Sequence, residues 1–228
     1  MSGILYIVST PIGNMADMSL RAIETLKAVN LILSEDTRET DKLLKHYNIS
    51  SPQISYRDQN HDRVFERIVE NLENDMSLAL LSDSGTPLVS DPGYKLVRDL
   101  IARGFTIDCI PGASAVISSL VVSGLPTDKF SFLGFLPKGN GVRAKLLKNY
   151  GDLDSTLIIY ESPFRVKKLL QEIFDVLGNR AVCIVNDQTK MYEAITRGML
   201  NDILSGAEKF KEKGEFVVLI GKKDFIYE

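Results

Sequence analysis

The chain has 228 residues, of which 44% are hydrophobic and 25% are charged. This composition is typical of a globular protein and excludes a disordered or collagen-like chain. The 27 Lys and Arg residues and 30 Asp and Glu residues give a net charge of −3. That balance excludes a protein that coats nucleic acid through a general basic excess, so any such contact must come from a local patch.

The two cysteines and the N-terminus predict a cytoplasmic protein. Cys109 and Cys183 both lie in apolar runs, which favours buried free thiols over a disulfide. The N-terminal residues lack the basic and apolar regions of a signal peptide. We also find no apolar run near the roughly 20 residues that a membrane span requires.

In the first half of the chain, short β-branched runs alternate with helical patterns. We expect strands at residues 4–8, 31–33, 53–57, 78–81 and 106–110. We expect helices at residues 20–27, at about 37–47, at 61–72 and between Pro92 and Gly104. The continuous apolar run 78–81 is typical of a strand that is covered on both faces. Repeated strand–loop–helix units predict an α/β fold with a mostly parallel sheet.

The second half repeats this alternation with more hairpin character. We expect an apolar helix at 113–122, strands at 130–135, 156–160, 181–185 and 216–220, and helices at 143–150 and 164–177. The Pro111-Gly112 pair is a candidate hinge. We therefore expect an N-terminal α/β domain of residues 1–112 and a C-terminal α/β domain of residues 113–228.

Three Gly/Pro loops follow expected strands, at residues 9–14, 82–93 and 111–115. In an open α/β sheet, ligands bind at the carboxyl ends of the strands, where small residues let the backbone approach a ligand. One such loop is ordinary turn chemistry. Three loops that converge on one sheet edge favour a ligand site.

Several common sites are excluded by their spacing. There is no GxxxxGK[ST] run, which excludes a P-loop, and no GxSxG elbow. Residues 139–144 match GxGxxA, but they lie far from the first strand–helix turn that a dinucleotide site needs. His46 and His61 share no zinc-ligand spacing with the cysteines, so we expect no metal.

Acidic residues near strand ends are candidate proton acceptors. They are Glu35, Asp36, Asp83, Asp91 and Glu161. Asp36 is equally suited to cap a helix, and so is Glu161. Basic residues gather at Lys138, Arg143, Lys145 and Lys148 and again at Arg165, Lys167 and Lys168. Most of these predict a solvated face, whereas Arg38 and Arg165 follow an acidic strand end closely and could grip a phosphate.

Five segments occur in an order and spacing that resemble a known family. They are PIGNMAD (11–17), EDTR (35–38), SDSGTPLVSDPGY (82–94), PGASA (111–115) and YESP (160–163). The chain resembles the ribosomal RNA small subunit methyltransferase I family, a tetrapyrrole methylase-like branch of class III methyltransferases, from residue 6 to 221. The resemblance implies two α/β domains, each with a mixed, mostly parallel sheet flanked by helices, and a cleft between them for S-adenosylmethionine. It also implies a homodimer that 2′-O-methylates a cytidine in the decoding region of 16S rRNA, within the small ribosomal subunit.

Carried over residue by residue, the resemblance implies a cofactor site of Pro11, Asp83, Gly85, Thr86, Val89, Ser114, Ala115, Tyr160 and Thr189. A ribose hydroxyl needs a base, and we expect Glu161 and Asp36 to be the candidates, with Lys190 third. We expect Arg38, Lys138, Arg143 and Arg165 to contact rRNA.

Two departures from the family pattern leave alternatives open. Members usually show a run like ARELTK where this chain has residues 185–190, VNDQTK, and they often have His where this chain has Phe164. A same-fold methyltransferase for a tetrapyrrole or a protein side chain is one alternative. A non-catalytic protein that binds the ribosome is the other.

Overall fold

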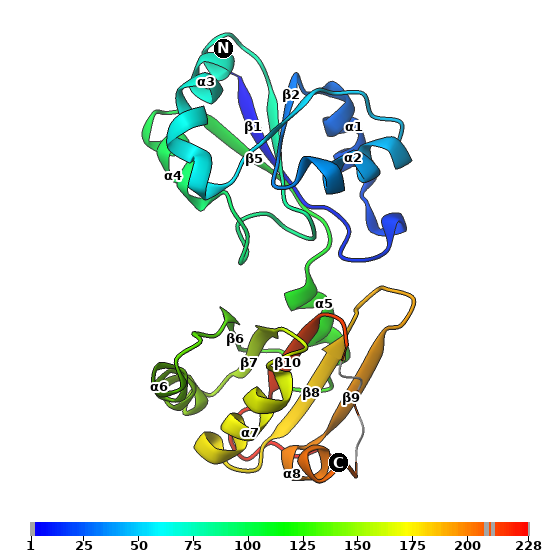
Figure 1. Cartoon of the computed structure of the whole chain (residues 1–228), viewed down its shortest axis with the longest axis vertical. Helices are drawn as coiled ribbons and strands as arrows, with labels where there is room; N and C mark the ends of the chain where they lie inside the picture. Colours follow the sequence, from blue (N-terminus) through cyan, green and yellow to red (C-terminus); the bar gives the residue numbers. More distant parts are fainter. Residues whose placement is uncertain (1–2, 208–209, 211–212, 228) are drawn as a thin grey trace. The chain divides into compact units, whose positions relative to one another are not determined.

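The computed structural model describes residues 3–207, 210 and 213–227. The chain divides into two units, Met1–Ser114 (unit 1) and Ala115–Glu228 (unit 2). Each unit, drawn as a ribbon in Figure 1, contains its own five-stranded sheet. Each also has its own clusters of buried hydrophobic side chains.

The sheet of unit 1 is parallel throughout, with strand order β3-β2-β4-β1-β5. Its strands are β1 (Ile4–Val8), β2 (Leu31–Ser34), β3 (Gln53–Ser55), β4 (Leu78–Leu81) and β5 (Thr106–Ile110). All four residues of β4 are buried, as its continuous apolar run predicts for a central strand.

Two pairs of helices cover the two faces of this sheet (Figure 1). The helices are α1 (Leu20–Ala28), α2 (Thr37–His46), α3 (His61–Glu73) and α4 (Tyr94–Ala102), with short 3₁₀ turns at Met15–Asp17 and Asp58–Asn60. Apolar residues of α3 and α4 pack on one face, and those of α1 and α2 pack on the other. The side chains of Ser19 and Asp36 cap α1 and α2, so capping fixes where both helices begin.

The sheet of unit 2 is mixed, with strand order β6-β7-β10-β8-β9. Its strands are β6 (Phe130–Phe135), β7 (Thr156–Glu161), β8 (Ala181–Asn186), β9 (Ala194–Met199) and β10 (Phe216–Ile220). Only β6 and β7 are parallel, while the other neighbours are antiparallel. The α/β class is confirmed, but the mostly parallel character expected of both sheets belongs to unit 1.

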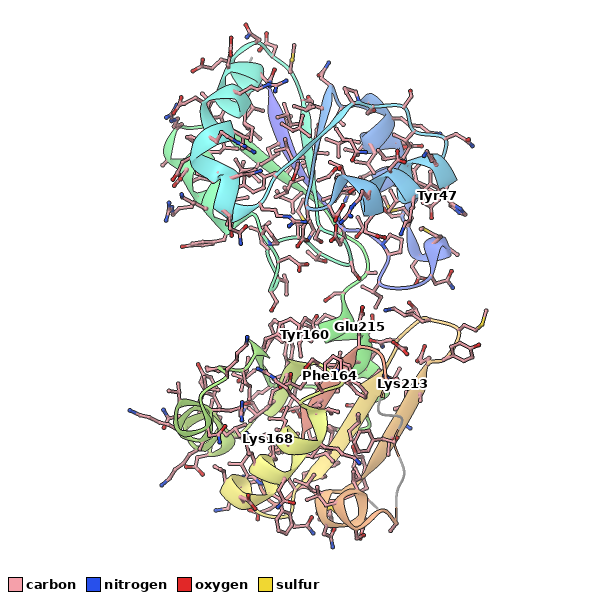
Figure 2. The ribbon with its side chains drawn as sticks, viewed as in Figure 1. Tyr47, Tyr160, Phe164, Lys168, Lys213 and Glu215 are labelled. Atoms are coloured by element: carbon pink, nitrogen blue, oxygen red, sulfur yellow. The ribbon has the colours of Figure 1, made fainter. Side chains whose placement is uncertain are left out.

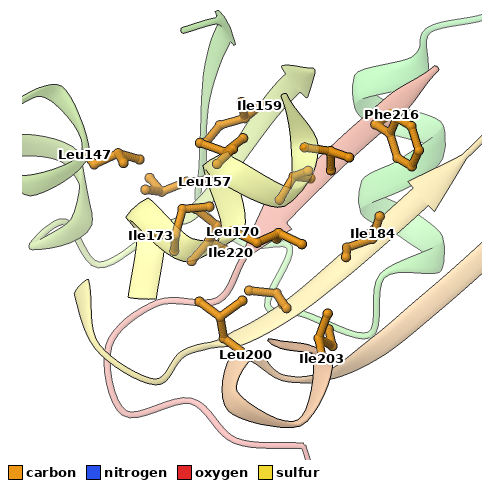
Figure 3. Close-up of a cluster of buried hydrophobic side chains, with 14 of the residues drawn as sticks. Leu147, Leu157, Ile159, Leu170, Ile173, Ile184, Leu200, Ile203, Phe216 and Ile220 are labelled. Atoms are coloured by element: carbon orange, nitrogen blue, oxygen red, sulfur yellow. The ribbon is translucent and has the colours of Figure 1, made fainter. Parts of the chain in front are cut away.

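One face of this second sheet carries three helices and the other carries one. The helices are α5 (Ala115–Val122), α6 (Asn140–Gly151), α7 (Val166–Leu177) and α8 (Leu200–Ser205). Figure 3 shows Leu147 of α6, Leu170 of α7 and Leu200 of α8 packed with strand residues in one cluster. The sequence did not predict β9 or α8, because β9 is an edge strand with no clear apolar alternation.

The two cysteines differ in their surroundings. Cys183 is fully buried in the cluster under α5, as expected. Cys109 is exposed, which corrects the expectation of two buried thiols. It lies in β5, an edge strand whose side chains are only partly covered. Within the described residues, no helix has the length and apolarity needed to cross a membrane.

Candidate functional site

Three loops of unit 1 meet at the carboxyl edge of its sheet. The Ser9 hydroxyl lies 3.0 Å from the Thr86 hydroxyl, which donates to the Ala113 carbonyl at 3.1 Å. The Thr10 amide donates to the Gly85 carbonyl at 2.8 Å. The loops converge because β4, β1 and β5 are parallel neighbours, so their carboxyl ends coincide. This edge brings together the segments of six expected cofactor residues, Pro11, Asp83, Gly85, Thr86, Val89 and Ser114.

The loop after β4 carries unusual backbone conformations. Gly85 has a φ of +80°, and a Cβ there would lie 3.2 Å from Ile12 Cγ2, so glycine is required. Leu88 and Ser90 have φ values of +71° and +67°, and they flank the partly exposed Val89. Non-glycine residues in this region cost about 1–3 kcal/mol each and concentrate at ligand sites. The strain supports this loop as a binding element.

Carboxylates from two strand ends are linked at the same edge. The Asp36 amide donates to Asp83 Oδ1 at 3.0 Å, and the Asp83 amide donates to Glu35 Oε2 at 3.3 Å. Partial burial is the main cause that raises the pKa of Glu35 and of Asp83. Burial, and then the neighbouring Glu35, raise the pKa of Asp91 to about 6. These three carboxyls are therefore stronger bases than ordinary ones.

Asp36 behaves differently because Arg38 occupies its carboxylate. Asp36 accepts from the Arg38 amide at 2.9 Å, from Nε at 3.0 Å and from Nη2 at 2.6 Å. These hydrogen bonds hold the pKa of Asp36 well below its usual range. Asp36 caps α2, which was one of the two sequence interpretations. Its low pKa makes it a weak proton acceptor.

Replacing Asp91 with Asn should stabilise the protein at neutral pH. The raised pKa means that folding favours the protonated carboxyl, so stability falls as pH rises from about 4 through about 6. Because Asp91 is partly exposed, we expect a gain on the order of 1 kcal/mol at pH 7.5. The gain should shrink towards pH 4. Urea unfolding at several pH values measures it, and an Asp91→Asn protein no more stable at pH 7.5 would contradict the prediction.

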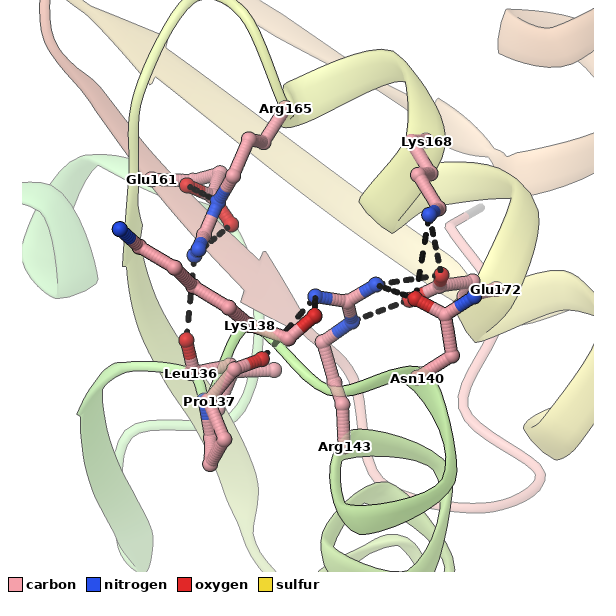
Figure 4. A network of polar contacts seen from close by, with 9 residues as sticks. All are labelled: Leu136, Pro137, Lys138, Asn140, Arg143, Glu161, Arg165, Lys168 and Glu172. Carbon is pink, nitrogen blue, oxygen red and sulfur yellow. Dashed lines mark hydrogen bonds and ion pairs between the residues drawn. The ribbon is translucent and has the colours of Figure 1, made fainter.

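In unit 2, two expected site residues pair with each other at the end of β7. Arg165 donates from Nε and Nη2 to the two oxygens of Glu161, each at 2.8 Å, and Nη2 also donates to the Leu136 carbonyl at 3.1 Å (Figure 4). Glu161 is 3% exposed and also accepts from the Ser162 amide. Glu161 therefore has both oxygens engaged, and the guanidinium of the partly buried Arg165 is bound to partners within unit 2.

Arg143 is also committed to internal partners. It is 4% exposed and forms a two-pronged ion pair with Glu172. It also donates to the Pro137 carbonyl at 3.0 Å and to Asn140 Oδ1 at 3.1 Å (Figure 4). The sequence grouped Arg143 with Lys138 as a phosphate contact. Its burial instead favours an internal role, whereas Lys138 is exposed.

The turn after β8 leaves buried acceptors unsatisfied. Asn186 Oδ1, Gln188 Oε1 and Thr189 Oγ1 accept no hydrogen bond within the described part of the chain. Asp187 and Thr189 have φ values of +48° and +62°, so this turn is strained in the same alternating way as residues 88–90. Buried acceptors without partners call for a ligand that donates. The turn therefore suits a ligand that carries amine or hydroxyl donors.

The sequence predicted Thr189 but not Gln188 or Asn186, which lie in the run that departs from the family pattern. Of the two other expected cofactor residues, Ala115 begins α5. Tyr160 lies in β7 and packs edge-on against Phe132 and Phe135, with ring centroids 4.8 and 5.6 Å away.

His61 is a buried residue in the core of unit 1. His61 is buried between the Tyr56 hydroxyl, 2.9 Å from Nδ1, and an Asp99 carboxylate oxygen, 3.1 Å from Nε2. Over residues 3–207, 210 and 213–227, no group of three or more His, Cys, Asp or Glu side chains could hold a metal ion.

Comparison with known proteins gives consistent matches along the chain. A family model described as Tetrapyrrole (Corrin/Porphyrin) Methylases matches residues 4–204. The ribosomal RNA small subunit methyltransferase I of Halalkalibacterium halodurans is 43% identical over 218 residues, which cover 96% of this chain and 75% of the relative. The protein of the same name from Thermotoga maritima is 40% identical over 222 residues, 97% of this chain and 100% of the relative.

Solved structures share the fold at low sequence identity. The methyltransferase CobJ is 18% identical and superimposes with a TM-score of 0.72 over 97% of this chain and 95% of that one. A uroporphyrin-III C-methyltransferase from Thermus thermophilus, complexed with S-adenyl homocysteine, is also 18% identical, with a TM-score of 0.63. The superimposed region covers 95% of this chain and 97% of the Thermus thermophilus chain.

Proposed function

The chain belongs to the ribosomal RNA small subunit methyltransferase I family, and from this we infer that it methylates the ribose 2′-oxygen of cytidine C1402 in 16S rRNA. The similarity to relatives of that name over nearly the whole chain carries this conclusion. S-adenosylmethionine supplies an electrophilic sulfonium methyl group. The likeness to porphyrin methylases is at fold level only and favours no tetrapyrrole substrate.

We propose that unit 1 binds S-adenosylmethionine through its three converging loops. Gly85 and the strained Leu88–Ser90 segment supply backbone groups in fixed conformations. In unit 2, Gln188 and Thr189 offer acceptors to a ligand that carries hydrogen-bond donors. Holding the methyl donor and the acceptor oxygen in a fixed relative orientation supplies much of the rate acceleration of a methyl transfer.

For the proton acceptor, the contacts favour Asp83 over the two residues that sequence placed first. Asp83 lies two residues after β4 and is accessible to a substrate, while partial burial of its carboxyl raises the pKa. The charge of Asp36 is one of the causes that raise it, and the Asp36 amide holds Oδ1. We propose that Asp83 takes the ribose proton and that Asp36 positions it. Glu161, closed by Arg165, is then a positioning residue in unit 2.

Lys138 and Arg38 are the basic residues best suited to touch rRNA phosphates. Lys138 is exposed beside the Arg143 and Arg165 pairs, and the Arg38 side chain is 85% exposed although it binds Asp36. Because the net charge is −3 and each unit offers only one such residue, recognition largely by shape of a structured particle is favoured. We propose that the substrate is the small ribosomal subunit and that the enzyme works in the cytoplasm.

We also propose that the enzyme is a homodimer, with α5 among its contact elements. Ile117 and Val121 of α5 are exposed apolar residues, and apolar surface of this kind suits a protein interface. Light scattering coupled to gel filtration measures the mass, and a monomer at working concentration would contradict this.

The function is tested by incubating the protein with labelled S-adenosylmethionine and unmethylated small subunits. The product should be a single 2′-O-methylcytidine, identified by nuclease digestion and mass spectrometry. Label on a base, on a protein or on no product at all would refute the proposal.

A further inference from the structure

Two phenylalanines stand exposed at the carboxyl ends of the parallel strands β6 and β7. Phe164, three residues after β7, is 95% exposed, and Phe135, the last residue of β6, is 60% exposed. Burying such a side chain stabilises a protein by about 1.5–3 kcal/mol, so exposure of both gains nothing for folding. Exposed apolar groups rimmed by polar ones are typical of interaction sites.

The backbone around both aromatic residues is held firmly. Arg165, next to Phe164, donates to the carbonyl of Leu136, next to Phe135, at 3.1 Å. The same guanidinium is fixed by the buried Glu161 carboxylate. Both phenylalanines therefore flank one hydrogen bond between the two loops, and Figure 2 shows Phe164 and Tyr160 at the end of unit 2 where β7 finishes.

The shape of β6 contributes to the exposure of Phe135. The pairing of β6 with β7 shifts register between Phe132 and Gly134, and Gly134 has a φ of +61°. Such a bulge re-aims the side chains that follow it. Phe135 then pairs in register with Tyr160 and packs edge-on against its ring. The Tyr160 ring thus packs against one side of Phe135, while the rest of the Phe135 ring stays exposed.

A positive charge adjoins this aromatic edge. Lys138 is exposed, and the carbonyl groups of its loop are held by Arg143 and Arg165. Figure 4 shows the Lys138 side chain extending on the side of the loop where the Glu161–Arg165 pair lies. Exposed aromatic rings beside a lysine match the chemistry of an unpaired nucleotide, whose base stacks and whose phosphate is anionic.

We propose that Phe164 and Phe135 form a stacking platform for an unpaired base of the substrate RNA, with Lys138 on the adjoining phosphate. This rests on the proposed function, since it names how the same enzyme engages its rRNA. It assigns a substrate-positioning role to Phe164, at a position where members of the family often have His. The platform orients the RNA and takes no part in the methyl transfer itself.

The first test compares Phe164 variants in steady-state methylation of unmethylated small subunits. Phe164→Ala and Phe164→Leu should raise KM for the subunit by at least about fivefold, while kcat stays within twofold, because base stacking contributes to binding. Phe164→Trp should keep or lower KM, because an indole stacks at least as well. Equal effects of Trp, Leu and Ala would overturn stacking, as a structural role predicts no preference for an aromatic ring.

Salt dependence separates the platform from the charge. Phe164→Ala should weaken RNA binding without changing the slope of log K against log salt, whereas Lys138→Ala should reduce that slope by about one. A Phe164→Ala protein with an altered slope would overturn the assignment.

Fluorescence gives a direct reading, because the chain has no tryptophan. Phe164→Trp introduces a single indole, and stacking of a base should quench it when a short RNA of the decoding region is added. Phe130→Trp is the matched control, since Phe130 is 41% exposed at the opposite end of β6. Quenching at 164 but not at 130 is expected, and equal quenching or none overturns the inference.

The two proposals fail in distinguishable ways. A wild-type protein that does not methylate small subunits overturns the proposed function and this inference with it. A wild-type protein that does, together with Phe164→Ala at normal KM, overturns the platform alone.

Discussion

Asp83→Asn should lower kcat by at least about a hundredfold while leaving the fold intact. A positioned general base contributes about 10²–10⁴ in rate, and an amide cannot accept the proton. Asn keeps the oxygen that accepts from the Asp36 amide at 3.0 Å. The raised pKa of Asp83 means that its charged form gains nothing from folding, so the substitution should not destabilise the protein. Single-turnover methylation and urea unfolding measure the two effects.

The split between kcat and KM decides whether Asp83 is a base or a cofactor ligand, as the family resemblance implied. Loss of kcat with an unchanged KM for S-adenosylmethionine indicates a base, whereas a raised KM with normal kcat indicates a ligand and would contradict the assignment.

Asp36→Asn is the companion variant, because it removes a charge that raises the Asp83 pKa. In a plot of kcat against pH, kcat falls on the acidic side as pH drops through the pKa of the base. This acidic limb of the profile should move to lower pH in Asp36→Asn. A limb that stays in place would argue against the coupling of these two carboxyls.

Arg143→Ala should destabilise the protein by about 3 kcal/mol. Removing one partner of a buried ion pair typically costs about 3–5 kcal/mol. Glu172 would keep only the more distant Lys168, whose Nζ lies 3.8 Å from its Oε1, so we expect a loss at the lower end of that range. The Pro137 carbonyl and Asn140 would lose a donor as well. Urea unfolding measures the loss. Lys138→Ala is the matched basic control, and because Lys138 is exposed its effect should stay within about 0.5 kcal/mol.

Two further measurements separate an internal role for Arg143 from a phosphate contact. Arg143→Met combined with Glu172→Leu should recover much of the lost stability, because similar apolar side chains replace a buried pair well. The salt dependence of RNA binding should be unchanged in this double variant. A slope reduced by about one would restore Arg143 as a phosphate contact.

Local patterns sufficed for most of the fold. The apolar run of β4 and the capping residues Ser19 and Asp36 set the elements of unit 1, because burial and capping act over a few residues. β9 escaped prediction because an edge strand needs no apolar alternation. The sequence placed a boundary near Gly112, and the structure divides the chain after Ser114.

The candidate site was predictable only as a set of segments. The three loops after β1, β4 and β5 could be named because strand ends share one edge of a parallel sheet. The state of each charged group could not, because it depends on partners distant in the chain. Arg143 pairs with Glu172, and the pKa of Asp83 depends on Asp36, 47 residues away.

By itself, the sequence determined the α/β class, the family resemblance and the loops that we propose as the cofactor site, because motifs and periodicity are local. Only the tertiary structure decided which charged side chains are available. In the folded chain, Arg165 binds the carboxylate of Glu161, the pKa of Asp83 is raised, and the Phe164 side chain is exposed. Burial and electrostatic coupling are properties of neighbours in space, and neither can be read from spacing along the chain.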